Sequence, residues 1–285
     1  MPLILDGKKA AAAICARLQK QIASLMEKPE LAIIQIGERE ESTAYIERKK
    51  AFGKSIGVSV RHISLLESVS EAEVVQQIDA LNADEGVSGV IVQLPLPAHL
   101  DRVRIQNAVG LPKDADGLAE GSDFTPATAR GIVELLEFYD IPVLRKRVAV
   151  LGRSALVGTP TAEALRKAGA EVTVCHSQTP NTKTITRASD IIVVAIGKPR
   201  RIGGEYFRND GTQTVIDVGI TAVTEKGEER LEEEIPKRKL VGDVDFDSVK
   251  DIVAAISPVP GGVGPMTVAA LFENLVSAYE RQTRV

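Results

Sequence analysis

The chain has 285 residues, of which 44% are hydrophobic and 26% are charged, and these proportions are typical of soluble globular proteins. Its length is sufficient for two domains with separate cores. A net charge of −4 argues against binding to nucleic acid or to an anionic membrane surface. The apolar run within residues 1–10 is too short for a signal peptide, and no stretch is apolar enough to span a membrane.

Cysteine and histidine usage gives two further expectations. Cys15 and Cys175 are far apart and form no C-x-x-C motif, which favours a reducing compartment, and we expect the cytoplasm. The three histidines lack the spacing of metal ligands, so we predict no bound metal.

The first 97 residues alternate between predicted helices and strands. Apolar periodicity predicts helices over residues 7–25 and 42–56. Apolar runs predict strands over residues 31–36, 58–64 and 87–93. This alternation predicts an α/β fold built on parallel, doubly wound strands.

One lysine of the second predicted helix stands out. Projected at 100° per residue, Lys49 shares the inward face with Tyr45 and Phe52, where a buried ammonium group is costly unless it has a partner. Two interpretations remain open. The side chain reaches the surface along its stem, or it is a functional lysine whose pKa burial lowers.

Polar residues follow the third predicted strand. Gln93 lies at its carboxyl end, where ligands bind in open α/β sheets, although an amide there can also satisfy loop backbone. In the acidic turn over residues 112–117, Asp114 or Asp116 is a candidate ligand for N–H groups, and either is equally suited to cap the turn. We place a domain boundary near Ser122, before a connecting helix.

Residues 147–170 form a strand, a polar turn and a helix. The turn reads GRSALVG, and Pro160 fits the first turn of the helix that follows. This arrangement directs backbone N–H groups and a positive dipole end at a phosphate. Arg153 lies in the turn, and no acid occurs at residues 175–177 after the next strand, which favours NADP over NAD. The alternative is a solvent-facing arginine in a structural turn.

The remaining sequence continues the strand pattern and ends in a rigid loop. Short strands are predicted over residues 191–195, 215–218 and 239–244. The stretch SPVPGGVGPMT, residues 257–267, combines proline stiffness with glycines that permit close backbone approach. It suits a preorganised ligand wall, or else an irregular crossover into the last helix, residues 267–281.

Eight motifs, in order, resemble the bifunctional methylenetetrahydrofolate dehydrogenase/methenyltetrahydrofolate cyclohydrolase family over nearly the whole chain. The resemblance implies oxidation of 5,10-methylenetetrahydrofolate with NADP, then hydrolysis to 10-formyltetrahydrofolate, in one-carbon metabolism. It also implies a homodimer, a catalytic folate-binding domain over residues 1–122 that residues 258–285 complete, and an inserted Rossmann-type NADP-binding domain over residues 123–257. The motifs are S-x-x-Y-x-x-x-K, VQLPLP, KDADG, GRSALVG-x-P, VTVCHS, DVGI, GDVDF and PVPGGVGPMT.

The resemblance further implies individual roles. Lys49 is similar to the catalytic lysine, Gln93 to the amide that tunes it, Asp116 to the carboxylate that holds the pterin ring, and Tyr45 to the residue that stacks beside the folate. The other contacts implied for folate are Pro260 and Gly261. The contacts implied for NADP are Thr128, Gly152, Arg153, Ser154, Ser177 and Ile220. We also expect Thr128 to be a helix N-cap.

The chain also departs from the family pattern. Ala127 and Ala129 stand where the family usually has Cys and Pro, and Thr159 replaces a frequent lysine. The segment between Asp116 and Phe124 is shorter than usual. Two alternatives remain open: a dehydrogenase of another small substrate in which Lys49 polarises a carbonyl, and a non-catalytic dinucleotide sensor.

Overall fold

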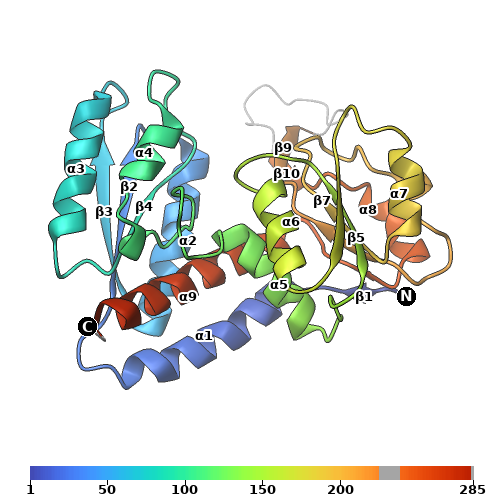
Figure 1. The fold of residues 1–285 in the computed structure, drawn as a ribbon, viewed down its shortest axis with the longest axis horizontal. Helices are drawn as coiled ribbons and strands as arrows, with labels where there is room; N and C mark the ends of the chain where they lie inside the picture. Colours follow the sequence, from blue (N-terminus) through green and yellow to red (C-terminus); the bar gives the residue numbers. More distant parts are fainter. Residues whose placement is uncertain (225–237, 284–285) are drawn as a thin grey trace, which may run out of the picture. The chain divides into compact units, whose positions relative to one another are not determined.

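The computed structural model describes residues 1–224 and 238–283 (Figure 1). It divides into two compact units. The six-stranded unit combines Met1–Ala10 with Thr128–Met266, and the three-stranded unit combines Ala11–Ala127 with the chain from Thr267 onward. We describe each unit by itself.

These units divide the chain at positions other than the predicted boundaries, residues 122 and 257. Strand β1 (Leu3–Ile4) pairs in parallel with β11 (Ala255–Ile256), and the N–H of Gly7 donates to the carbonyl oxygen of Gly261 at 2.9 Å. These contacts place the first ten residues and the loop after β11 in the six-stranded unit.

The three-stranded unit is built on a parallel sheet. Its strands have the order β3-β2-β4, with β2 in the centre, and six of the seven residues of β2 are buried, which explains its nearly unbroken apolar sequence. The strands are β2 (Glu30–Ile36), β3 (Ser59–Leu65) and β4 (Gly89–Val92), and the helices are α1 (Gly7–Ala23), α2 (Glu40–Ile56), α3 (Glu71–Ala83) and α4 (Arg102–Ala108).

The C-terminal helix α9 (Val263–Thr283) packs into the three-stranded unit. The rings of Phe52 on α2 and Phe272 on α9 stack with centroids 5.2 Å apart. Arg17 on α1 forms an ion pair with the buried Glu273 of α9. The prediction that the C-terminal helix completes the N-terminal part of the chain is therefore confirmed.

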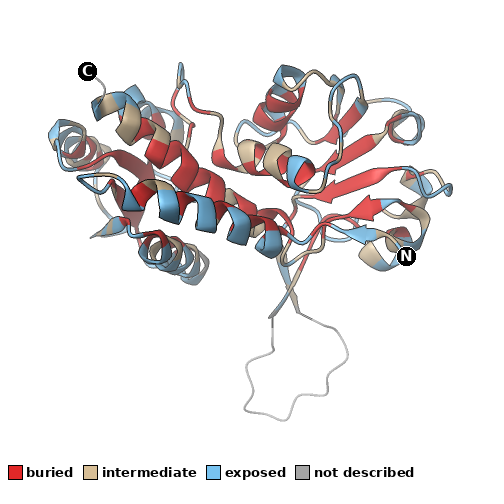
Figure 2. Ribbon diagram, turned by 90° about the horizontal axis from the view of Figure 1, so that it is seen from below, coloured by how far each residue is buried: buried red, intermediate tan, exposed pale blue. Residues whose placement is uncertain are grey.

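The six-stranded unit contains one parallel sheet with the order β1-β11-β8-β7-β5-β6. Helices α6 and α7 lie on opposite faces of this sheet (Figure 1), and its central strands are buried (Figure 2). The predicted parallel, doubly wound α/β fold is thus confirmed. The strands are β5 (Arg147–Leu151), β6 (Glu171–Cys175), β7 (Ile191–Val194) and β8 (Thr214–Asp217), and the helices are α5 (Ala127–Phe138), α6 (Gly158–Lys167), α7 (Thr182–Ala188) and α8 (Phe246–Val249).

Two local predictions differ from the structure. The strand expected over residues 239–244 is β10 (Arg238–Val241), which pairs antiparallel with β9 (Thr221–Thr224) outside the parallel sheet. Helix α5 begins at Ala127, so Thr128 lies inside its first turn and not at its N-cap. No helix within residues 1–224 and 238–283 is long and apolar enough to cross a membrane.

Candidate active site

Lys49 is buried within the three-stranded unit, with 8% of its surface exposed. The interpretation that this side chain reaches the surface is therefore wrong. Its Nζ donates a hydrogen bond to Oε1 of Gln93 at 3.0 Å. The Nε2 of Gln93 donates to the carbonyl oxygen of Leu94 at 2.8 Å, which orients the amide so that its oxygen faces the amine. Gln93 thus both satisfies loop backbone and partners Lys49.

The electrostatic environment brings Asp116 into the same site. Burial lowers the pKa of Lys49, and the negative charge of Asp116 opposes that shift. Burial likewise raises the pKa of Asp116, while the charge of Lys49 acts in the opposite direction. Each group therefore has its charged form disfavoured by burial and favoured by the other, an arrangement suited to proton transfer near neutral pH.

The structure distinguishes the two aspartates of the KDADG turn. Asp114 is buried, and its carboxylate accepts N–H donors from Gly117 at 3.1 Å and Ala119 at 2.9 Å. Asp114 therefore caps the turn. Gly117 has φ +70°, and a Cβ at this position would lie 2.7 Å from the carbonyl oxygen of Phe124. The turn thus requires glycine, and it leaves Asp116 as the aspartate whose charge acts on Lys49.

Tyr45 lies one helical turn before Lys49 on α2 and is half-buried. The guanidinium carbon of Arg48 lies 5.4 Å from the centroid of the tyrosine ring. This contact covers one face of the ring, and the stacking role of Tyr45 remains a prediction.

The turn after β5 is shaped by two glycines and a serine. Gly152 has φ +117°, and a Cβ there would lie 2.1 Å from the carbonyl oxygen of Ala195. A Cβ on Gly158 would lie 2.4 Å from the carbonyl oxygen of Gly152. The Oγ of Ser154 accepts N–H donors from Val157 and Gly158, each at 3.2 Å. The backbone is therefore closed into a tight cradle where α6 begins, which fits a phosphate group.

Arg153 and Ser177 lie at the exits of adjacent parallel strands. Leu151 at the end of β5 is in register with Cys175 at the end of β6, and both Arg153 and Ser177 are exposed. A cation and a hydroxyl next to the phosphate cradle, with no acid at residues 175–177, suit a ribose 2′-phosphate.

The other predicted contacts also belong to the six-stranded unit. Thr128 lies in the first turn of α5, and Ile220 follows β8 and is 40% exposed. Pro260 and Gly261 lie in the loop between β11 and α9. The structure therefore places Lys49, Gln93, Asp116 and Tyr45 in one unit and the predicted dinucleotide contacts in the other.

Two buried aspartates of the six-stranded unit were not assigned from the sequence. Asp243 is fully buried, and its carboxylate accepts N–H donors from three successive residues after β7 at 2.6–2.8 Å. Asp217 accepts N–H donors from Gly219, Asp243 and Val244. Burial raises the pKa of Asp217 to about 7, and the charge of Asp243 acts in the same direction. The pair fixes the backbone where strands β7 and β8 end.

A signal for this pair was present in the DVGI and GDVDF motifs. Each aspartate lies close to a glycine that belongs to the other motif. A Cβ on Gly242 would lie 1.8 Å from Oδ2 of Asp217, and a Cβ on Gly219 would lie 2.2 Å from Cγ of Asp243. The glycines make room for the carboxylates, a relation that sequence spacing alone does not reveal.

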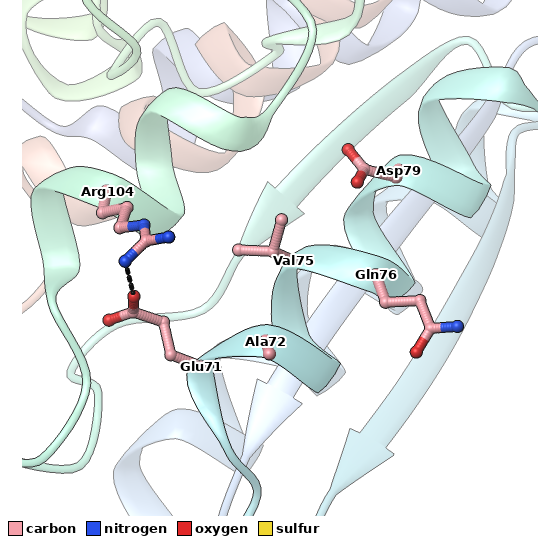
Figure 3. A pocket seen from close by; sticks show the side chains of 6 residues that line it. All are labelled: Glu71, Ala72, Val75, Gln76, Asp79 and Arg104. Atoms are coloured by element: carbon pink, nitrogen blue, oxygen red, sulfur yellow. Dashed lines mark ion pairs between the residues drawn. The ribbon is translucent and has the colours of Figure 1, made fainter.

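A surface groove between α3 and α4 has a volume of about 510 Å³ (Figure 3). An ion pair between Glu71 and Arg104, with 2.8 Å between their atoms, crosses it. None of its lining residues is a predicted site residue. Among the residues that the structure describes, no group of three or more His, Cys, Asp and Glu side chains is arranged to hold a metal ion.

Comparison with known proteins identifies both parts of the chain. Residues 5–116 match the catalytic domain of tetrahydrofolate dehydrogenase/cyclohydrolase, and residues 126–283 match its NAD(P)-binding domain. The bifunctional protein FolD of Azoarcus sp. is 38% identical over 99% of this chain and 97% of that protein. FolD of Acholeplasma laidlawii is 39% identical over 99% of this chain and 100% of that protein.

Solved structures agree with this comparison. The Trypanosoma brucei N5,N10-methylenetetrahydrofolate dehydrogenase-cyclohydrolase, complexed with NADP cofactor and inhibitor, aligns with a TM-score of 0.91 and 35% sequence identity. The alignment covers 100% of this chain and 99% of that structure. The chain belongs to the tetrahydrofolate dehydrogenase/cyclohydrolase family.

Proposed function

We propose that this chain oxidises 5,10-methylenetetrahydrofolate to 5,10-methenyltetrahydrofolate with NADP and then hydrolyses the product to 10-formyltetrahydrofolate. The observation that carries the proposal is the buried Lys49, hydrogen-bonded to Gln93 and acted on by the charge of Asp116. This arrangement lies in the part of the chain that matches the family's catalytic domain.

NADP bound to this chain would supply the hydride acceptor for the methylene carbon of the folate. The residues of the six-stranded unit that would hold it are Gly152, Arg153 and Ser154 in the turn after β5, with Ser177, Ile220 and Thr128. For this step the protein supplies orientation, because hydride transfer requires contact between two bound molecules and no proton shuttle at the reacting carbon.

The hydrolytic step requires proton transfers, and we assign these to Lys49. Water attacks the methenyl carbon and must lose a proton, and a ring nitrogen takes up a proton when its bond to that carbon breaks. A lysine whose pKa is lowered by burial exchanges protons at neutral pH more readily than an exposed one. Gln93 holds the amine in place through its oxygen.

Four residues contact folate in this proposal. Asp116 accepts hydrogen bonds from the N–H groups of the pterin, Tyr45 stacks beside the ring, and Pro260 and Gly261 form a wall. We further propose a homodimer in the cytoplasm, where two free cysteines are compatible with a reducing environment.

A coupled assay tests the proposed function directly. With 5,10-methylenetetrahydrofolate and NADP, we expect NADPH and the methenyl intermediate to form together and the intermediate then to decay to 10-formyltetrahydrofolate. Reduction of NADP with another small substrate only would support the alternative dehydrogenase. Binding of NADP without any turnover would support a dinucleotide sensor.

Replacing Arg153 with alanine tests the preference for NADP. A charge-assisted contact with the 2′-phosphate accounts for roughly 10- to 150-fold in affinity, so we expect Arg153→Ala to weaken NADP binding by that factor and to leave NAD binding unchanged. Titration calorimetry with both cofactors measures this. Arg187→Ala, which removes an exposed arginine from α7, is the control. Equal losses for the two cofactors would contradict the assignment.

A further inference from the structure

A buried amide on α9 joins the two ends of segment 115–125, which contains Asp116. Asn274 is fully buried. Its Nδ2 donates hydrogen bonds to the carbonyl oxygens of Ala115 and Thr125, each at 3.0 Å. Both hydrogens of a single amide group thus hold backbone positions that are ten residues apart, one of them directly before Asp116.

Two other side chains of α9, Leu275 and Arg281, contact segment 115–125. A Cβ on Gly89 would lie 2.6 Å from Cδ1 of Leu275 and 3.1 Å from Cβ of Ala115, so these three residues are in close contact. The guanidinium carbon of Arg281 lies 4.7 Å from the centroid of the Phe124 ring, and its Nη1 lies 3.3 Å from an oxygen of Asp123. Helix α9 therefore contacts segment 115–125 at both ends.

The segment is also held from within. Asp114 accepts N–H donors from Gly117 and Ala119. The N–H of Ala127 donates to the carbonyl oxygen of Asp116 at 3.2 Å. The backbone on either side of Asp116 is consequently held by bonds within the segment and by the two donors of Asn274 from α9.

We propose that Asn274 is a positioning residue that sets the place of the Asp116 carboxylate and hence the affinity for folate, an inference that rests on the proposed role of Asp116. In this chain the segment after Asp116 is short, and an amide on the last helix supplies the restraint. Without its two donors the segment relaxes, and Asp116 moves relative to both the pterin and Lys49. Displacements of about 1 Å in an active site cost on the order of 100-fold in rate.

Asn274→Leu, which keeps the side-chain size and removes both donors, is the first test. We expect kcat/KM for 5,10-methylenetetrahydrofolate to fall by about 10- to 100-fold, while the KM for NADP stays unchanged. The negative charge of Asp116 raises the pKa of Lys49, so displacement of Asp116 shifts the inflection of the cyclohydrolase pH profile to lower pH. Ser277→Ala is the control, because the hydroxyl of Ser277 bonds only to the carbonyl of Glu273 within α9 among the contacts described.

A double-mutant cycle separates positioning from a general loss of structure. In an Asp116→Asn background we expect Asn274→Leu to lower kcat/KM by less than about threefold, because the carboxylate through which it acts is absent. The same loss in both backgrounds, or no loss in the native background, overturns the inference alone. Undiminished folate turnover in Asp116→Asn overturns the proposed role of Asp116 and this inference with it.

Arg281→Ala provides a second variant if Asn274→Leu shows no cooperative thermal transition. The Arg281 side chain is 55% exposed, so its removal leaves the core intact. We expect a rise of about threefold in the KM for folate, with no change for NADP, and no such rise in the Asp116→Asn background. An unchanged KM for folate in Arg281→Ala would show that the contacts at residues 123–124 do not position Asp116, and an unchanged kcat/KM for folate in a folded Asn274→Ala protein would overturn the proposal.

Discussion

Lys49→Met is expected to lower cyclohydrolase activity by about 10²–10⁴-fold, the contribution typical of a positioned general acid or base, and to affect dehydrogenase activity far less. Methionine keeps the volume of the buried stem and removes the amine that donates to Gln93. Only the hydrolytic step needs a proton shuttle, so the two activities separate. Both are measured in the same purified protein, with its thermal transition as a check on folding.

Lys50→Met is the matched control for this experiment. Lys50 is adjacent in sequence, but its Nζ pairs with Glu47 at 2.8 Å on the surface of α2, so its removal is expected to leave both activities unchanged. Burial lowers the pKa of Lys49 from 10.5, so the cyclohydrolase pH profile should inflect below that value, and Lys49→Arg should abolish the inflection. Native cyclohydrolase activity in Lys49→Met would show that Lys49 is structural.

Asp116→Ala is expected to impair both reactions, because both use the same bound pterin ring. Loss of paired, charge-assisted hydrogen bonds should lower kcat/KM for folate by roughly 10²–10³-fold, with NADP affinity unchanged. Steady-state kinetics for the two substrates measure this. Glu120→Ala, which removes an exposed carboxylate in the same segment, is the control. Intact folate binding in Asp116→Ala, together with its loss in Asp114→Ala, would indicate the other aspartate.

The face that carries Lys49 was predictable because helical periodicity is local. Positions 45, 49 and 52 fall on one side of any regular helix, whatever surrounds it. Whether the Lys49 side chain is buried or reaches solvent was not predictable, because its partners Gln93 and Asp116 come from the end of β4 and from a later turn. Only the folded chain decides between a buried amine and one that reaches solvent.

The two aspartates of KDADG show the same limit at shorter range. Both fit a turn-capping role by residue type. Which one caps depends on the direction of each side chain in a turn that Gly117 closes against the backbone of Phe124. The position of Asp114 in this turn follows from local hydrogen bonds, but the approach of Asp116 to Lys49 follows from the packing of separate elements.

Three features of the six-stranded unit were missed or displaced in the predictions, each for its own reason. Strands β1 and β11 contain two residues each, too few for any periodicity to show. The backbone N–H of Asp243 donates to the carboxylate of Asp217 across 26 residues. Thr128 was expected at a helix N-cap, but the helix begins at Ala127, a difference within the ordinary uncertainty of helix ends.

The division of each unit into two separate stretches of sequence has a consequence for synthesis on the ribosome. Strand β1 pairs with β11, about 250 residues later, and the sheet of β2, β3 and β4 remains without α9 until residues 263–283 are made. Neither hydrophobic core is complete until strand β11 or helix α9, respectively, has been synthesised. Both units therefore complete their folding through contacts between residues far apart in sequence, and such long-range contacts slow the final step.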